Sequence, residues 1–191
     1  MSPEDKAPFY DNADDFIASF DSSFQDILYR GHGGAADDNA FMTDYYGHAL
    51  IYADDNPSNV DAYVYNPSDV MYFKPEVFDE FRRAMNRLDN KEIVQKYNEA
   101  LANHRFTDYY DKKARSVIKI IRSDKPADEI TMNHNVMDPL VPLLQLYARE
   151  QGRDIIAFKG GDYDGDQIEF VVGNPSRLVN LRAVYAKAHN L

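Results

Sequence analysis

The chain has 191 residues, which is enough for one domain with a buried core, and its formal net charge is -11. An acidic surface repels phosphate groups, so we expect neither nucleic acid nor an anionic membrane as a partner. Because the sequence has no cysteine, disulfide bonds, a thiolate nucleophile and cysteine-bound zinc are excluded.

The sequence carries no recognisable signal for a membrane or for secretion. No apolar run approaches the length of a membrane span. The first residues, 1–5, lack the basic and then apolar pattern of a signal peptide. We therefore expect a soluble protein that is cytoplasmic where it is made.

The first elements in chain order are an arm, a helix and a strand. Residues 1–15 are polar and acidic, which predicts a loose arm. Apolar residues then recur at helical spacing and predict an amphipathic helix; they are Phe16, Ile17, Phe20, Phe24 and Ile27. The run 26–30 predicts a short strand that ends in the glycine-rich turn 31–34.

A helix and two strands follow. Thr43 or Asp44 is suited to cap the start of a helix that runs to Ala53. The alternation of apolar and polar residues over 60–65 predicts a strand, and residues 70–73 predict another.

The second half predicts mainly helices and two late strands. Three apolar stripes indicate a helical stretch over about 76–122. A helix around 140–147 is closed by Gly152, and residues 155–158 and 167–172 are strand-like. No repeat or long linker divides the sequence, so we expect 1–191 to form a single domain of the α+β class.

The first candidate functional segment is Tyr29-Arg30-Gly31. A guanidinium at a strand end can hold a phosphate or a ribose through paired hydrogen bonds, and a glycine lets the backbone approach a planar ligand. A surface arginine before a turn would give the same three letters, so this segment alone leaves both interpretations open.

The second candidate segment joins Thr43 to Tyr52. Thr43 can orient a carboxylate, and Tyr52 on the following helix can offer a stacking face to an aromatic ligand. A helix cap and a core tyrosine are the structural alternative.

The third candidate segment is the late strand with Glu169. Strand alternation places Gln167 and Glu169 on one face, directly after the glycine- and aspartate-rich turn 160–166. A carboxylate beside a cleft suits catalysis, whereas an edge strand with two solvated polar residues is the structural alternative.

In this order the three segments resemble the ADP-ribosyltransferase superfamily, in its arginine–serine/threonine–glutamate branch. The matching features are Tyr29-Arg30-Gly31, Thr43-Asp44 and the run Glu-Phe-Val-Val-Gly-Asn-Pro-Ser at 169–176. That branch includes bacterial toxins and effectors and phage-encoded domains, so the resemblance also allows a protein delivered into a host cell.

The resemblance implies two small packed β-sheets around an NAD cleft, with surrounding helices and with 76–122 as a helical insertion. NAD would be the substrate, a protein would be the acceptor of ADP-ribose, and no metal would be required. Tyr29, Arg30 and Gly31 would bind NAD, with Arg30 on its phosphates or ribose and Gly31 on the carboxamide. Thr43 would complete that site, and Tyr52 would place its ring against nicotinamide.

Catalysis would centre on Glu169, which would bind the ribose 2′-hydroxyl and stabilise the cationic transition state. Thr43 would help to position it. Gln167 gives the Gln-x-Glu pattern of toxins that modify side chains other than arginine, and Tyr163 would meet the acceptor protein. The Ser-Thr-Ser element of many toxins is reduced here to Met42-Thr43-Asp44, which leaves open what supports Glu169.

Other interpretations remain. The turn 162–166 resembles the aspartate triad that holds Mg²⁺ in multisubunit RNA polymerases, and it resembles a calcium loop. The first lacks a basic path for nucleic acid, and the second has Gln167 and Gly173 where glycine and glutamate are needed. An acidic decoy protein that blocks a basic partner, or an NAD glycohydrolase on the same fold, is also compatible with the sequence.

Overall fold

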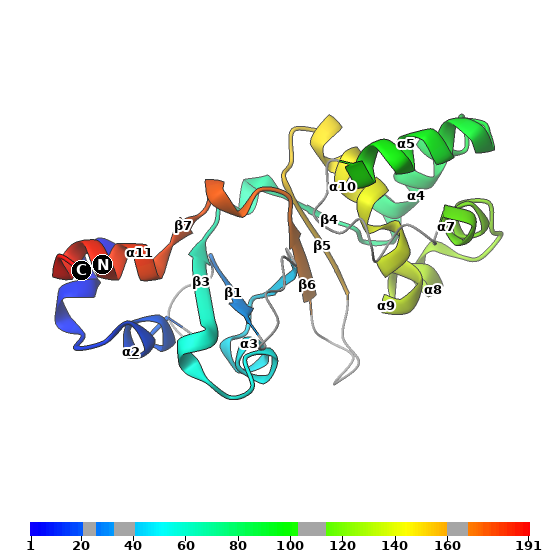
Figure 1. Ribbon diagram of the computed structural model, residues 1–191. Coiled ribbons are helices and arrows are strands. Elements are labelled where there is room, and N and C mark those ends of the chain that lie inside the picture. Colours follow the sequence, from blue (N-terminus) through cyan, green and yellow to red (C-terminus); the bar gives the residue numbers. More distant parts are fainter. Residues whose placement is uncertain (21–25, 33–40, 103–113, 160–167) are drawn as a thin grey trace. The chain divides into compact units, whose positions relative to one another are not determined.

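The computed structural model describes residues 1–20, 26–32, 41–102, 114–159 and 168–191. The chain falls into two compact units, which are described separately. Unit 1 consists of Met1–Pro67 together with Asn174–Leu191, and unit 2 is the continuous segment Ser68–Gly173. Figure 1 shows their helices and strands coloured along the sequence.

Unit 1 contains an antiparallel sheet whose strands pair in the order β2-β1-β3-β7. These strands are β1 (Ile27–Gly31), β2 (Phe41–Thr43), β3 (Val60–Val64) and β7 (Val179–Asn180). Its helices are α1 (Pro3–Lys6), α2 (Ala13–Ala18), α3 (Tyr46–Tyr52) and α11 (Leu181–His189). Short 3-10 turns lie at η1 (Ala7–Phe9), η2 (Pro57–Asn59) and η5 (Pro175–Arg177).

The core of unit 1 lies on one face of β1 and β3. Alternate strand residues, among them Ile27 and Tyr29, pack with apolar residues of α2, α3 and α11. Helices from the two ends of the chain meet in this core, because α2 and α11 contact each other (Figure 1). The remaining members of the cluster include Phe16, Ile17, Phe20, Ala49, Ala53, Val60, Ala62, Leu181 and Tyr185.

The N-terminal residues differ from the prediction of a loose arm over 1–15. They form α1, η1 and the start of α2, and Ala7 is completely buried. Local capping explains the helices, because the side chains of Ser2 and Asn12 accept hydrogen bonds from the backbone N–H groups of Asp5 and Asp15.

The helix predicted from Phe16 to Ile27 is shorter than expected. Helix α2 ends at Ala18, and Ile27 begins strand β1. Ile27 and Tyr29 are both buried on the core face of this strand. Ile27 was included in the predicted helix because its position in the sequence fits the helical spacing of the apolar residues before it. The predicted member Phe24 lies outside the described residues.

Unit 2 combines three described strands with a group of helices. Strand β4 (Val70–Tyr72) runs parallel to β5 (Ile155–Lys159), and β5 pairs antiparallel with β6 (Ile168–Val172). The helices are α4 (Pro75–Met85), α5 (Asn90–Ala102), α7 (Ala114–Ile121), α8 (Ala127–Thr131), α9 (His134–Met137) and α10 (Val141–Glu150). The 3-10 turn η4 (Asp138–Leu140) precedes α10, and η3 (Pro67–Asp69) precedes β4.

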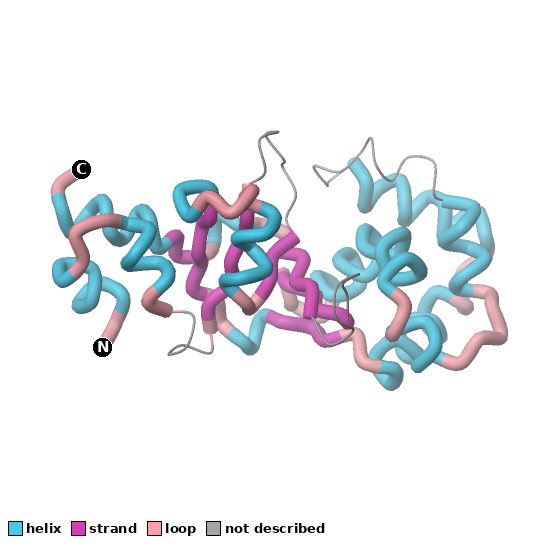
Figure 2. The backbone as a smooth tube through the Cα atoms, turned by 90° about the horizontal axis from the view of Figure 1, so that it is seen from below, coloured by secondary structure: helices cyan, strands magenta, loops and turns pink. Residues whose placement is uncertain are grey.

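The helices of unit 2 lie on one side of its strands (Figure 2), where α10 contacts β5. Aromatic rings fill this region: Phe81 of α4 has its ring centroid 5.6 Å from that of Tyr147 and 6.1 Å from that of Phe73. Helices α4, α5 and α7 lie where the apolar stripes of 76–122 predicted helices. The helix closed by glycine is confirmed as α10, with Gly152 at φ 75° after its end.

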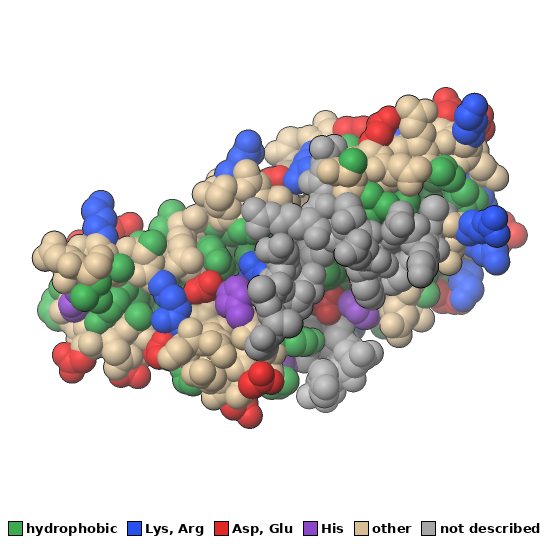
Figure 3. Space-filling view, in the orientation of Figure 1, with side chains coloured by type: hydrophobic (Ala, Val, Ile, Leu, Met, Phe, Trp, Pro, Cys, Tyr) green, Lys and Arg blue, Asp and Glu red, His purple; other side chains and the backbone are tan. Residues whose placement is uncertain are grey.

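These elements place the chain in the α+β class, as expected from the sequence. Among the described residues, no helix combines the length and the apolar character needed to cross a membrane. On the face drawn in Figure 3, acidic and basic side chains are interspersed over the described surface of each unit.

Candidate functional site

The end of strand β1 carries the first candidate segment, and helix α3 packs directly on it. Tyr29 is 1% exposed and meets Tyr46 of α3 edge to face, with 5.6 Å between the ring centroids. A Cβ atom on Gly31 would overlap the carbonyl oxygen of Ala49 and would lie 2.9 Å from the backbone nitrogen of Ala53. The close approach of α3 therefore requires glycine at position 31.

Thr43 lies next to this segment across the sheet. It is the register partner of Tyr29 between β1 and β2. Its Oγ1 accepts a hydrogen bond from the backbone N–H of Tyr45 at 3.2 Å, so the hydroxyl shapes the turn that leads into α3. The expected capping role shifts by one or two residues, because Tyr45 occupies the cap position of α3 without a side-chain bond.

Tyr52 is the last residue of α3 and lies close to Gly31 through its main chain. Its side chain is 57% exposed, and the neighbouring Ile51 is 51% exposed. An exposed tyrosine beside a closely packed strand end suits the stacking of a planar group. Contact with nicotinamide stays a prediction.

Arg30 points away from the core of unit 1, because successive side chains of a strand alternate between faces and Tyr29 and Gly31 face α3. Its register partner in β3 is Asp61. On this face Oη of Tyr63 donates a hydrogen bond to Oδ2 of Asp61 at 3.3 Å. Burial raises the pKa of Tyr63, Asp61 adds to the rise, and the positive charge of Arg30 opposes it.

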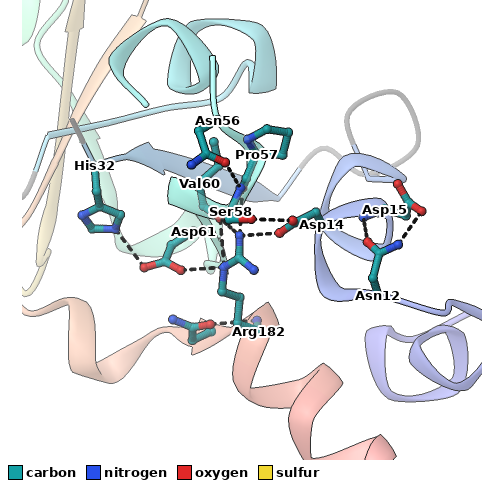
Figure 4. A network of polar contacts seen from close by, with 11 residues as sticks. Asn12, Asp14, Asp15, His32, Asn56, Pro57, Ser58, Val60, Asp61 and Arg182 are labelled. Carbon is teal, nitrogen blue, oxygen red and sulfur yellow. Dashed lines mark hydrogen bonds and ion pairs between the residues drawn. The ribbon is translucent and has the colours of Figure 1, made fainter. Parts of the chain in front are cut away.

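Asp61 is also the centre of the polar network drawn in Figure 4. Its Oδ2 lies 2.9 Å from Nε2 of His32, and its Oδ1 lies 3.2 Å from Nε of Arg182. Arg182 pairs in addition with Asp14 at 2.8 Å and donates to the carbonyl oxygen of Val60 at 2.7 Å. The network therefore ties strand β3 to helices α2 and α11 on the face of the sheet that carries Arg30.

Sequence reasoning missed this network. Asp61 was only a polar position in an alternating strand, and Arg182 lies in a helix that the motifs do not include. Their pairing joins residues far apart in the chain, and no local pattern encodes such a contact. His32 directly follows Gly31 of the first candidate segment, and this position is the only feature of the sequence that draws attention to it.

Glu169 lies in unit 2 as the second residue of strand β6, and its register partner on β5 is Phe158. Its Oε2 is 3.1 Å from Nδ1 of His134, the first residue of α9, and both atoms are buried from solvent. The atoms are close enough for an ion pair, although their angles fall outside those of a hydrogen bond. The His134 ring in turn stacks on Phe158, with 6.3 Å between centroids and 23° between planes.

The pairing of Glu169 with a histidine was not predicted from the sequence. His134 lies in a polar segment rich in asparagine and aspartate, which predicted only a loop. The side chains of Glu169 and His134 are 20% and 26% exposed. Glu169 is therefore mostly buried, unlike the solvated polar residue of the structural alternative.

Two predicted site residues, Gln167 and Tyr163, lie outside the described residues, as does the acidic turn 162–166. Among the residues that the structure does describe, no group of three or more histidine and acidic side chains could hold a metal ion. The two metal interpretations of the acidic turn therefore stay untested predictions.

Unit 2 also contains an open cavity of about 720 Å³ between α4 and the end of α7. Its arginines already bind neighbouring groups: Arg82 pairs with Asp79 at 2.7 Å and donates to the carbonyl oxygen of Lys125. Arg122 donates to the side-chain oxygen of Asn86 at 2.6 Å. The cavity contains none of the predicted site residues, and its cations hold the helices together.

The structure thus brings Tyr29, Arg30, Gly31, Thr43 and Tyr52 into unit 1, around the end of β1, whereas Glu169 belongs to unit 2. No family model, no curated protein and no solved structure matches this chain. Any functional conclusion therefore depends on the chemistry of these residues.

Proposed function

We propose that this protein is a mono-ADP-ribosyltransferase that moves ADP-ribose from NAD to a protein acceptor and releases nicotinamide. The observation that carries the proposal is the packing at the end of β1. There an arginine precedes a glycine that has no room for a side chain, and Thr43 lies across from Tyr29 at the start of the segment leading to α3. The sequence motifs that resemble the transferases are therefore associated with a specific local structure rather than with a random turn.

In this proposal the strand end in unit 1 binds NAD. The Arg30 guanidinium is a suitable partner for the diphosphate or the adjacent ribose, because its planar donors match paired oxygen atoms. The Gly31 backbone holds the carboxamide of nicotinamide, and the exposed ring of Tyr52 stacks on its plane. Thr43 and Tyr29 fix the turn and the strand from which these groups act.

Glu169 stabilises the transition state in the proposed reaction. The bond between C1′ of the ribose and the nicotinamide nitrogen breaks, and its electron pair leaves with nicotinamide. Positive charge develops on the ribose, where a fixed carboxylate lowers its energy. A nucleophilic atom of the acceptor side chain then bonds to C1′ and loses its proton. Gln167 is the predicted catalytic partner of Glu169 in the Gln-x-Glu pattern, and Tyr163 is the predicted contact to the acceptor.

The test uses labelled NAD, the purified protein and a bacterial lysate, with Glu169→Gln as the comparison. This substitution keeps the shape of the side chain and removes its charge. We expect label on discrete proteins with the wild type and at least a hundredfold loss with the variant, in the range found for groups that stabilise transition-state charge, about 10²–10³. Circular dichroism and thermal unfolding of both proteins control for misfolding.

The other outcomes discriminate between the remaining functions. Release of nicotinamide by the wild type without labelled protein would replace the transferase by an NAD glycohydrolase. Equal labelling by the wild type and Glu169→Gln would remove Glu169 from the reaction. No NAD consumption and no NAD binding by calorimetry would contradict the enzymatic proposal altogether and leave an acidic interaction protein.

A further inference from the structure

The carboxylate of Glu169 has a defined partner, and the partner comes from the helical part of unit 2. Nδ1 of His134 lies 3.1 Å from Oε2 of Glu169. The two atoms lie within ion-pair distance, but their angles are not those of a hydrogen bond. Because two acceptors would repel each other at this distance, we take Nδ1 as the ring nitrogen that carries the hydrogen.

The contact is built into the fold. The His134 ring stacks on Phe158, which is 2% exposed, and Phe158 is the register partner of Glu169. Asn133 precedes the helix as its cap residue, so His134 stands at the first position of α9. One strand pair and one helix start therefore fix the imidazole and the carboxylate relative to each other.

Burial makes this partner energetically important. Oε2 of Glu169 is inaccessible to water, and the register partner of Glu169 on the same face of the sheet, Phe158, is buried and apolar. A carboxylate oxygen in such surroundings is stable only with a donor or a positive charge beside it. Nδ1 of His134 faces Oε2 at ion-pair distance without hydrogen-bond angles, and a protonated imidazole there supplies the positive charge; the exposed fifth of the Glu169 side chain does not include this oxygen.

From this geometry we propose that His134 is a positioning residue that fixes the Glu169 carboxylate for the reaction. This inference rests on the proposed function. It assigns a role to helix α9, whose first residue places the imidazole at ion-pair distance from Glu169. His134 acts through Glu169 and does not itself contact the substrate.

Three substitutions separate the donor from the packing. His134→Ala removes both the ring and the donor. His134→Phe keeps a ring to stack on Phe158 but has no donor, and His134→Asn keeps a donor at a distance from the backbone similar to that of Nδ1. The exposed neighbour Asn135 provides the matched control Asn135→Ala on the same helix.

The readout is steady-state release of nicotinamide from NAD, with kcat and KM determined separately. We expect His134→Ala and His134→Phe to lower kcat about 10²-fold, the loss associated with a misplacement of about 1 Å in a reacting group. KM for NAD should stay within a factor of about three, because His134 does not contact NAD. His134→Asn should recover a substantial part of kcat, and Asn135→Ala should match the wild type.

The outcomes separate a failure of this inference from a failure of the proposed function. Full activity of His134→Phe, equal losses in His134→Asn and His134→Ala, or an effect confined to KM would each overturn the positioning role while the wild type remains an active enzyme. A wild type that consumes no NAD would overturn both proposals together.

A measurement that needs no activity checks the contact itself. A double-mutant cycle of His134→Phe and Glu169→Gln in urea unfolding should give non-additive shifts in the unfolding midpoint, because the two side chains interact directly. Additive shifts would overturn the inference.

Discussion

The packing at Gly31 leads to a prediction about stability that can be derived from the structure alone. In Gly31→Ala the new methyl group would overlap the carbonyl oxygen of Ala49 and would lie 2.9 Å from both the backbone nitrogen of Ala53 and the backbone carbonyl carbon of Tyr52. All three obstacles are main-chain atoms of α3 or its cap, so no side-chain rotation relieves the overlap. Either the helix moves away from β1 or the strand end bends.

Overpacking of this kind costs about 1–3 kcal/mol in the free energy of unfolding, and an immovable backbone favours the upper end. For a chain of this size, each kcal/mol lowers the melting temperature by roughly 2–4 °C. We therefore expect Gly31→Ala to lower the melting temperature by roughly 3–10 °C. Gly31→Leu should lower it further, because a larger side chain displaces α3 further.

Gly152 offers a matched control. Its φ of 75° disfavours any other residue, but no atom lies within 4 Å of the position where its Cβ would be. Gly152→Ala and Gly152→Leu should therefore cost similar amounts, about 1–2 kcal/mol for the backbone conformation alone. Thermal unfolding followed by circular dichroism compares the four variants. If Gly31→Ala and Gly31→Leu melt like the wild type, α3 does not pack against β1 as described.

Two further predictions concern the polar face of β3. Arg182→Ala removes the guanidinium that pairs with both Asp14 and Asp61, so we expect the free energy of unfolding in urea to fall by about 1–3 kcal/mol. The control Arg177→Ala, at an exposed position, should change it by less than about 0.5 kcal/mol. Equal effects of the two substitutions would contradict the network. Burial and Asp61 raise the pKa of Tyr63 above its usual 10.0, so the folded state holds this proton more tightly than the unfolded state. The resulting stability is complete below pH 10 and is lost as the pH rises through the folded pKa. Tyr63→Phe should flatten that alkaline decline in urea midpoints, and an unchanged slope would show that Tyr63 does not cause it.

Much of the secondary structure followed from periodicity, because the elements concerned have strong local signals. The apolar stripes of α4, α5, α7 and α10, the alternation of β3 and the short apolar runs of β1 and β5 gave their positions within a few residues. The N-terminal helices were missed because they are too short for a stripe and depend on caps at Ser2 and Asn12. The sequence also could not reveal that residues from both ends of the chain share one core.

The candidate site could be predicted only in part, for a similar physical reason. Local motifs identify Arg30, Gly31 and Glu169 as unusual residues, but the partners of such residues come from distant parts of the chain. His134 reaches Glu169 from a helix start, and Arg182 reaches Asp61 from the last helix. Both contacts depend on tertiary packing, so a reading of short segments finds the charged group and misses its counterpart.

The division of the chain has a consequence for its synthesis on the ribosome. Unit 2 is continuous, and all of its residues emerge before strand β7 and helix α11, which complete unit 1. Until then, the apolar faces of α2 and β3 lack their final covering from Leu181 and Tyr185. Newly made chains therefore pass through a stage in which unit 2 can already fold while unit 1 exposes part of its core, and this stage is the most vulnerable to proteolysis and aggregation.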